Sequence, residues 1–228
     1  MNLSEILSLC NYVANKEKLG NTLTPEQYNI LLEAVNVDFF RKEYEDAQKL
    51  ALAQNVRIGS VIFKSGALKV FRCKDDAKAV ATGVLTVSDL TKTYAYWVSM
   101  TTTYNGAKRG IELISDAELE DRLTNLLNKP IEYFPVAIDN GDKILVYPTD
   151  VTPVDFTYLR MPTQPIYAWT QDAYDRAIYS SAESTELEFA EIYHPQIVQE
   201  LLSRIGVSLK AEQVQAYAER AKAENKIV

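Results

Sequence analysis

The chain has 228 residues, 47% of them hydrophobic, and a formal net charge of −7 from 24 Lys and Arg against 31 Asp and Glu. A chain of this size and composition can bury a core, which excludes a wholly disordered protein. The excess of acidic residues argues against a protein that binds nucleic acid phosphates or a membrane through a basic surface. Two cysteines and one histidine exclude a disulfide framework and any metal site with two histidine ligands.

Residues 1–54 are expected to form a helical hairpin. Apolar residues recur at a spacing of three to four in the first part, which marks one face of a helix: Leu3, Ile6, Leu7, Cys10 and Val13. A second helix should start at Thr24-Pro25-Glu26-Gln27, because Thr24 and Gln27 can cap each other's backbone N–H groups and proline suits the first helical turn. We detect no secretory leader and no apolar run of ~18 residues, so we expect no membrane anchor.

Residues 55–182 are expected to form a β-rich section of antiparallel strands. Strand-like runs bounded by turn residues occupy 67–73, 94–102, 143–147, 154–159 and 165–169. Asn140-Gly141 between 134–138 and 143–147 is a strong hairpin signal.

One helix, at 116–128, should interrupt this section. Ser115 and Glu118 form a capping box before it, and leucines at 119, 123, 126 and 127 follow at helical spacing. Lys129-Pro130 should end it.

Residues 183–228 should return to helix after one short strand. Thr185, Leu187 and Phe189 alternate with acidic residues, which favours an edge strand over 185–189. His194-Pro195 should open a helix that Gly206 closes, and a last helix should run over 209–224. The expected fold class is therefore α+β: an N-terminal helical hairpin with C-terminal helices, and a β-rich middle section with one inserted helix. Whether these sections share one core stays open.

Residues that could carry chemistry are few. The phosphate-binding glycine motifs and the nucleophile elbow are absent from the sequence. His194 beside Pro195 is more typical of a helix start than of a catalytic relay, and Cys10 and Cys73 are more typical of small buried residues than of nucleophiles. The acidic residues around Glu186 and Glu188 favour a solvated edge over a metal cage. We expect no cofactor and no metal.

Aromatic residues are the remaining unusual feature. Ten of the 14 tyrosines fall between Tyr94 and Tyr193, together with Trp97 and Trp169. Tyrosine combines an apolar ring with a polar tip, which suits surfaces that become buried on assembly. β-rich cores favour aromatic residues as well, and this pattern alone does not separate the two explanations.

Four segments, in order, carry a resemblance to a known family. They are ANKEKLGNTLTPEQYNILLEAVNVDFFRKEY (Ala14–Tyr44), ELISDAELEDRLTNLLNKPIEYFPVA (Glu112–Ala137), KILVYPTDVTPVDFTYLRMPTQPIYAW (Lys143–Trp169) and STELEFAEIYHPQIVQELLSRIGVSLKAEQVQAYA (Ser184–Ala218). Together they resemble virion proteins of tailed phages that infect Bacteroidetes, including the crAss-like group. The middle part is also similar to podovirus head-to-tail adaptors, which stack as rings beneath the portal.

The resemblance implies a structural subunit of the head-to-tail connector, or neck, and no enzyme. Its partners would be copies of itself in a 12-fold ring, the portal protein and other neck or tail proteins, with no membrane. Such a protein would be made in the bacterial host cytoplasm and located in the virion. Genomic DNA would pass through the ring without specific binding, and an acidic channel wall would repel its phosphates.

Two surfaces are candidates for contact within such a ring. The helix over 209–228 would dock on the portal or a neighbouring ring through Val214, Tyr217 and Ala221. The strand 185–189, with Leu187 and Phe189, or the region 148–165 would pair with a neighbouring subunit, and Arg160 is a candidate for an intersubunit ion pair.

Two other functions stay open at the level of sequence. A soluble ligand- or carbohydrate-binding module could use Trp97, Trp169 and the tyrosines as stacking platforms. An enzyme could use Glu186 and Glu188 as a carboxylate pair.

Overall fold

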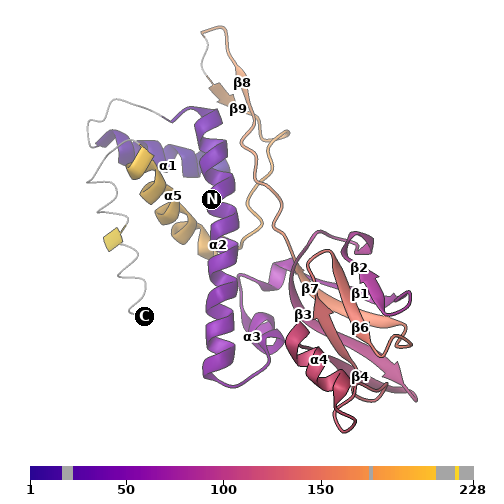
Figure 1. Cartoon of the computed structure of the whole chain (residues 1–228). Coiled ribbons are helices and arrows are strands. Elements are labelled where there is room, and N and C mark those ends of the chain that lie inside the picture. The colour runs from indigo at the N-terminus through magenta and orange to yellow at the C-terminus, as the bar shows by residue number, and fades with distance from the viewer. Residues whose placement is uncertain (17–22, 175–176, 209–218, 221–228) are drawn as a thin grey trace. The chain divides into compact units, whose positions relative to one another are not determined.

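The computed structural model describes residues 1–16, 23–174, 177–208 and 219–220. It confirms the α+β fold class, with N-terminal helices, a C-terminal helix and a large, curled, mostly antiparallel sheet (Figure 1). The chain divides into two compact units. Unit 1 comprises Met1–Ala53, Ser65–Val70 and Pro162–Val228, and unit 2 comprises Gln54–Lys64 and Phe71–Met161. No helix in the described part of the chain is long and apolar enough to cross a membrane.

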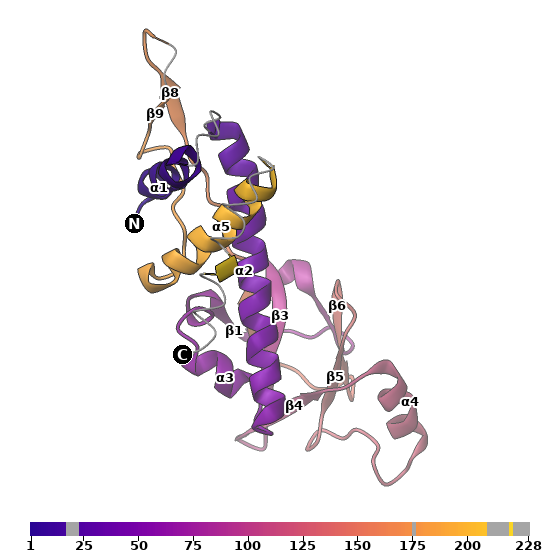
Figure 2. The same cartoon turned by 90° about the vertical axis from the view of Figure 1, so that its left-hand side faces the viewer.

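Unit 1 is built on three helices, α1 (Leu3–Lys16), α2 (Pro25–Ala53) and α5 (His194–Ser208). Both N-terminal helices pack against α5, and Figure 2 shows α5 lying beside α2. The capping box predicted at the start of α2 forms: Thr24 Oγ1 accepts from Gln27 N–H, and Gln27 Oε1 accepts from Thr24 N–H, each at 3.3 Å. α5 begins at His194 as predicted. Gly206 does not end it, because the helix continues to Ser208.

The core of unit 1 joins these helices to residues from the C-terminal half. The predicted face of α1 is buried at Leu3, Ile6, Leu7 and Cys10. Tyr28 in α2 is fully buried, and its hydroxyl donates to Leu3 O at 3.2 Å. Residues 162–182, part of the predicted β-rich section 55–182, belong to unit 1 together with most of the two helical ends. The helix predicted over 209–224, with Val214, Tyr217 and Ala221, lies outside the described residues apart from 219–220.

The sheet of unit 2 has seven strands in the order β1-β7-β3-β4-β5-β6-β2, and all neighbours are antiparallel except β4 and β5. The strands are β1 (Arg72–Lys78), β2 (Val84–Thr86), β3 (Tyr94–Tyr104), β4 (Ala107–Leu113), β5 (Val136–Asp139), β6 (Lys143–Tyr147) and β7 (Val154–Arg160). Two helices belong to the unit, α3 (Ile58–Lys64) and α4 (Asp116–Thr124), and η2 (Val87–Asp89) is a 3₁₀ turn. The core on this sheet includes Trp97, Met100, Ile144, Phe156 and Tyr158.

Turn residues set the hairpins of unit 2. Asn140-Gly141 joins β5 to β6 as predicted, and Gly141 has a φ of 82°. Asn105 and Gly106 join β3 to β4 with φ of 49° and 77°. Two positive φ values in succession suit the tight turn that matches the twist of paired strands.

Two predicted strands are wrong. Over 67–73, residues Lys69–Phe71 form a 3₁₀ turn (η1) and the strand starts only at Arg72. Over 165–169, Ile166 makes a single bridge to Thr185, and β8 (Trp169–Gln171) starts later and pairs with β9 (Ala177–Tyr179). The Asn29 side chain of α2 accepts from Tyr167 N–H at 2.8 Å and donates to Tyr167 O at 3.0 Å. A side-chain amide thus makes the bonds that a neighbouring strand would make.

The strand predicted over 185–189 is also wrong. Only Thr185 forms a β-bridge, and the next 3₁₀ turn, η3, covers Glu191–Tyr193. The alternation of apolar and acidic residues over 185–189 has another cause. Leu187 and Phe189 pack in the core of unit 1, where they are 9% and 3% exposed. Phe189 packs edge-on against Phe39 with ring centroids 5.0 Å apart. These two residues belong to the core, which corrects their proposed role as docking residues.

Helix α4 is shorter than predicted. It starts at the capping box, where Ser115 Oγ accepts from Glu118 N–H, but it ends at Thr124 instead of residue 128. Thr124 Oγ1 donates to the carbonyls of Glu120 and Asp121, and Asn125 Oδ1 accepts from Leu127 N–H at 3.0 Å. The Asn125 side-chain bond closes a turn after the last helical residue, which leaves Leu126 and Leu127 outside the helix.

Candidate assembly surfaces

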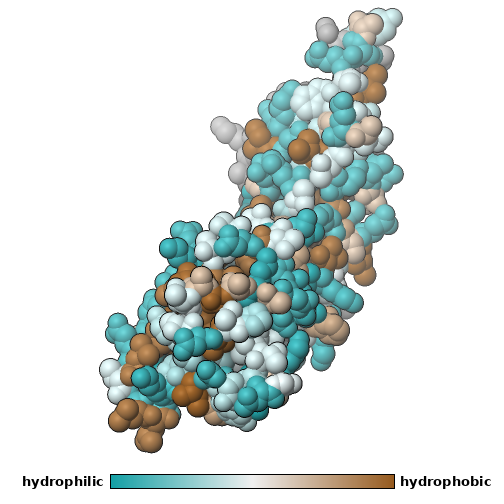
Figure 3. Space-filling view, turned by 90° about the vertical axis from the view of Figure 1, so that its right-hand side faces the viewer, coloured by the Kyte–Doolittle hydropathy of each residue, from teal (hydrophilic) through white to brown (hydrophobic). Residues whose placement is uncertain are grey.

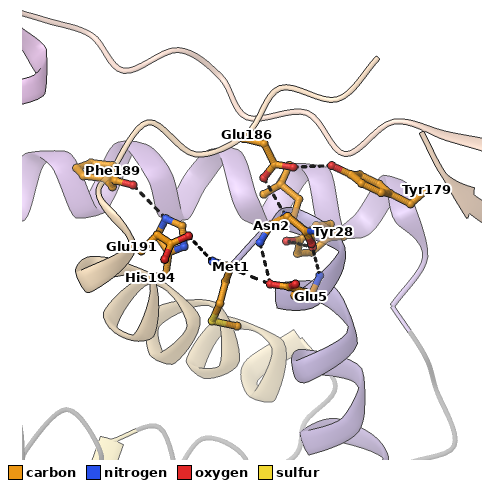
Figure 4. A network of polar contacts seen from close by, with 10 residues as sticks. Met1, Asn2, Glu5, Tyr28, Tyr179, Glu186, Phe189, Glu191 and His194 are labelled. Atoms are coloured by element: carbon orange, nitrogen blue, oxygen red, sulfur yellow. Dashed lines mark hydrogen bonds and ion pairs between the residues drawn. The ribbon is translucent and has the colours of Figure 1, made fainter. Parts of the chain in front are cut away.

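The two carboxylates considered as a catalytic pair hold backbone segments together in unit 1. Glu186 accepts from Leu3 N–H at 2.9 Å and from the Tyr179 hydroxyl (Figure 4). Glu188 accepts from Thr163 N–H at 2.7 Å. Leu3 begins α1, so Glu186 caps an N–H that has no partner within the helix. Both carboxylates therefore have structural roles.

His194 is buried at the start of α5. Its Nε2 lies 3.0 Å from Phe189 O, and because a carbonyl only accepts, Nε2 carries the proton (Figure 4). Cys10 is fully buried on α1, and burial raises the pKa of its thiol to about 12. Cys73 is partly exposed in β1. Among the residues that the structure describes, no group of three or more His, Cys, Asp or Glu side chains could hold a metal ion.

Arg160 and the tryptophans have neighbours in their own units. The Arg160 guanidinium lies 5.3 Å from the centroid of the Phe71 ring and donates to Met161 O at 3.2 Å. Trp97 is 8% exposed and belongs to the core of unit 2. Trp169 is partly exposed in β8. The intersubunit ion pair of Arg160 stays a prediction.

The most exposed apolar side chains of unit 2 follow α4. Leu126 is 91% exposed and Leu127 is 93% exposed. Leu123, Ile131 and Phe134 are exposed in the same segment. In Figure 3, brown, apolar atoms gather over the part of unit 2 that contains α4. Contiguous apolar exposure is typical of surfaces that bind a protein, a membrane or a ligand, and of surfaces that aggregate.

The loop after α4 is supported by packed aromatic rings and an arginine. The Arg109 guanidinium lies 3.9 Å from the centroid of the Tyr133 ring, and Tyr104 packs edge-on against Tyr133 at 6.3 Å. Tyr133 in turn packs edge-on against Phe134 at 4.6 Å. Since these partners belong to β3 and β4, the sheet holds Phe134 in place while its side chain stays 67% exposed.

A groove of about 580 Å³ runs over β3 and β4 between Arg57 and Phe134. Its lining is mainly apolar and comprises Arg57, Ile58, Trp97, Val98, Ser99, Met100, Thr101, Gly110, Ile111, Glu112, Leu113, Phe134 and Pro135. The floor is core: Met100 is 1% exposed. The rim is open, because Arg57, Leu113 and Phe134 are exposed. This shape can receive an apolar segment, with a cation at one side.

The outer strand β1 is a poor template for strand pairing. Its ladder with β7 is interrupted between Asp75 and Lys78, and Ala77 has a φ of 53°. Lys74 and Asp76 form an exposed ion pair on it. Charges and irregular backbone at an edge discourage pairing with another sheet, so an assembly contact through β1 is disfavoured.

The ribbon of β8 and β9 in unit 1 is different. Its paired residues are uncharged, and Thr170, Gln171, Ala177 and Ile178 are exposed. The rings of Tyr167 and Tyr179 stack at its base with centroids 5.0 Å apart. A two-stranded ribbon is only marginally stable alone in water, so it gains from a further strand or surface.

Sequence reasoning missed the exposed loop because the leucine spacing resembled a core-facing helix. The signal that could have found it is Asn125 and Asn128 on either side of Leu126-Leu127, since asparagine favours turns. Comparison with known proteins gave no family model that matches the chain and no curated relative.

Proposed function

We propose that this protein is a structural subunit of a tailed-phage virion, and that it forms a ring in the head-to-tail connector between portal and tail. The observation that carries the proposal is the exposed pair Leu126 and Leu127, in the same unit as an open groove with a mainly apolar lining. Burying two such side chains stabilises an association by roughly 2 kcal/mol each. A subunit surface that is completed by assembly accounts for this exposure.

Other features of the chain are consistent with that role. Glu186, Glu188 and His194, the side chains considered for chemistry, bind backbone groups of the same unit. The net charge of −7 suits a ring through which DNA passes, because a negative wall repels phosphates. The order of the four segments that resemble phage virion proteins adds a support that does not depend on the structure.

The experiment is a size measurement of the purified full chain, alone and with the portal protein of the same phage. We expect rings in negative-stain electron micrographs and a mass, by light scattering, that is a multiple of 25.7 kDa. A chain that stays monomeric with and without portal, or that turns over a small molecule, contradicts the proposal.

The C-terminal segment is proposed to dock on portal or on a neighbouring ring. Val214, Tyr217 and Ala221 would be its anchors. Deleting residues 209–228 should leave a folded, soluble protein that no longer enters particles. Normal incorporation of the truncated chain would show that this docking assignment is wrong, while the ring proposal itself would stand.

A further inference from the structure

The charges of the chain are unevenly distributed along the sequence. Between Asp46 and Asp75 there is no Asp or Glu, although the chain as a whole is acidic. The same stretch carries the cations Lys49, Arg57, Lys64, Lys69, Arg72 and Lys74. A stretch with this excess of positive charge can attract an acidic partner.

The part of this stretch in unit 2 surrounds α3. Arg57, Lys64 and Arg72 have no ion-pair partner among the described residues, and Phe63 is 57% exposed between them in sequence. The Arg72 guanidinium lies 5.7 Å from the centroid of the Phe63 ring. We name Arg57, Phe63, Lys64 and Arg72 the basic α3 face. It combines unpaired positive charge with an open apolar ring.

The end of α4 has the opposite character. Glu120 and Asp121 are exposed, and neither has an ion-pair partner within the described ranges. The exposed Leu123, Leu126 and Leu127 follow directly. We name these five residues the acidic leucine tip. Glu118, by contrast, is already paired with Arg122 at 2.6 Å, so it does not contribute free charge.

We propose that the acidic leucine tip of one copy docks on the basic α3 face of a second copy. The leucines would enter the groove that begins at Arg57 and Ile58, and Glu120 and Asp121 would pair with Arg57 and Lys64. This inference rests on the proposed ring, for which it names the contact between neighbours.

The choice of a second copy follows from the complementarity. The acidic leucine tip and the basic α3 face with its groove are both present on the same chain. Their charges are not paired with each other within one copy. Two different surfaces can meet head-to-tail, and contacts of that kind repeat round a closed ring if the rotation between neighbours closes.

Charge reversal tests the contact in full-length protein by sedimentation velocity over a series of concentrations. Glu120→Lys with Asp121→Lys makes both surfaces basic, and Arg57→Glu with Lys64→Glu makes both acidic. Each double variant should associate at least about tenfold more weakly than wild type, since like charges then meet across the contact. Mixed in equal amounts, the two variants should associate again, because the tip of each matches the α3 face of the other.

A matched control changes the same amount of charge elsewhere in unit 2. Asp142 and Asp150 are exposed and lie in loops next to β6, so Asp142→Lys with Asp150→Lys should leave association unchanged. Leu126→Gln with Leu127→Gln is a second test with no change in charge. It should weaken association, and its thermal unfolding should match wild type because both side chains are already in water.

The outcomes separate this contact from the ring proposal. Association that survives both charge reversals, or that the mixture does not restore, overturns the docking assignment and leaves the ring intact. A wild-type chain that stays monomeric at every concentration overturns the contact between copies and counts against the ring as well.

Discussion

The Glu186 carboxylate accepts a hydrogen bond from Leu3 N–H at 2.9 Å, which joins two residues 183 positions apart in the sequence. The bond places a negative charge at the positive end of α1, where it complements the helix dipole. It also ties the extended segment before α5 to the first turn of the chain. Glu186 is thereby a stabilising element of unit 1.

Glu186→Ala should lower the stability of unit 1 by about 1 kcal/mol, because Leu3 N–H and the Tyr179 hydroxyl lose their carboxylate acceptor. The effect is modest because this carboxylate is exposed to solvent. Hydrogen exchange of the α1 amides should quicken. Glu183→Ala is the control, since Glu183 is exposed in the same segment. Equal effects of the two substitutions would show that the contact of Glu186 with α1 does not stabilise unit 1.

Asp75 is a buried charge in unit 2. It is 6% exposed, accepts from Thr91 N–H at 2.8 Å and pairs with Lys78 at 3.2 Å. Burial alone would raise its pKa, but the bonds from Thr91 and Lys78 outweigh burial, so the pKa of Asp75 lies below its usual value. The ionised form therefore stabilises the fold.

Asp75→Asn should lower the free energy of unfolding by about 2 kcal/mol at neutral pH, where the charge-assisted bonds are lost. A lowered native pKa means that the wild-type advantage is fully present above the unfolded pKa of ~3.9 and disappears as the pH falls through the native pKa. Urea unfolding from pH 7 to pH 3 measures this. Asp76→Asn, at an exposed pair, should have almost no effect. A difference that does not change with pH would rule out the charge as its source.

Local signals predicted the parts of the fold that depend on local bonds. The capping box at Thr24 and the turn at Asn140-Gly141 fix their elements through residues three or fewer apart. Distant packing decided the rest. Leu187 and Phe189 alternate as a strand would, yet the core of unit 1 and the bonds of Glu186 account for that pattern without a strand partner.

The candidate surface shows the same limit. Leucines at 123, 126 and 127 have the spacing of a core-facing helix, and only the buried Leu119 keeps that role. Whether a leucine faces core or water depends on where the chain turns. The Asn125 side chain contributes to that turn by accepting from Leu127 N–H, and the spacing of apolar residues in the sequence carries no information about this bond.

The Cys10 thiol should be unreactive in the folded protein. With a pKa of about 12, roughly one thiol in ten thousand is ionised at pH 8, and only the thiolate is a nucleophile. Iodoacetamide labelling followed by peptide mapping should find Cys73 modified in the native chain and Cys10 modified only after unfolding. Cys73→Ser is the control and should abolish native labelling. Native labelling of Cys10 at a rate similar to that of Cys73 would contradict the burial of the Cys10 side chain on α1.

Substitutions at three glycines of unit 2 distinguish the effect of backbone strain on stability from the effect of a steric clash. Gly106 has a φ of 77° and open space where a Cβ would lie, so Gly106→Ala should cost about 1 kcal/mol from strain alone. Gly83 has a φ of 78°, and its Cβ would lie 2.7 Å from Val146 O, so Gly83→Ala should cost more. Gly110 has no positive φ, and its Cβ would make an ordinary contact with Arg57 at 3.7 Å.

Gly110→Ala should therefore stabilise unit 2 by about 0.5 kcal/mol, because alanine restricts the unfolded chain without straining the strand. Urea unfolding of the three variants should rank them Gly83→Ala, Gly106→Ala and Gly110→Ala, from least to most stable. If Gly83→Ala were no worse than Gly106→Ala, the close approach of β6 to Gly83, where Val146 N–H donates to Gly83 O at 2.7 Å, would not constrain that turn.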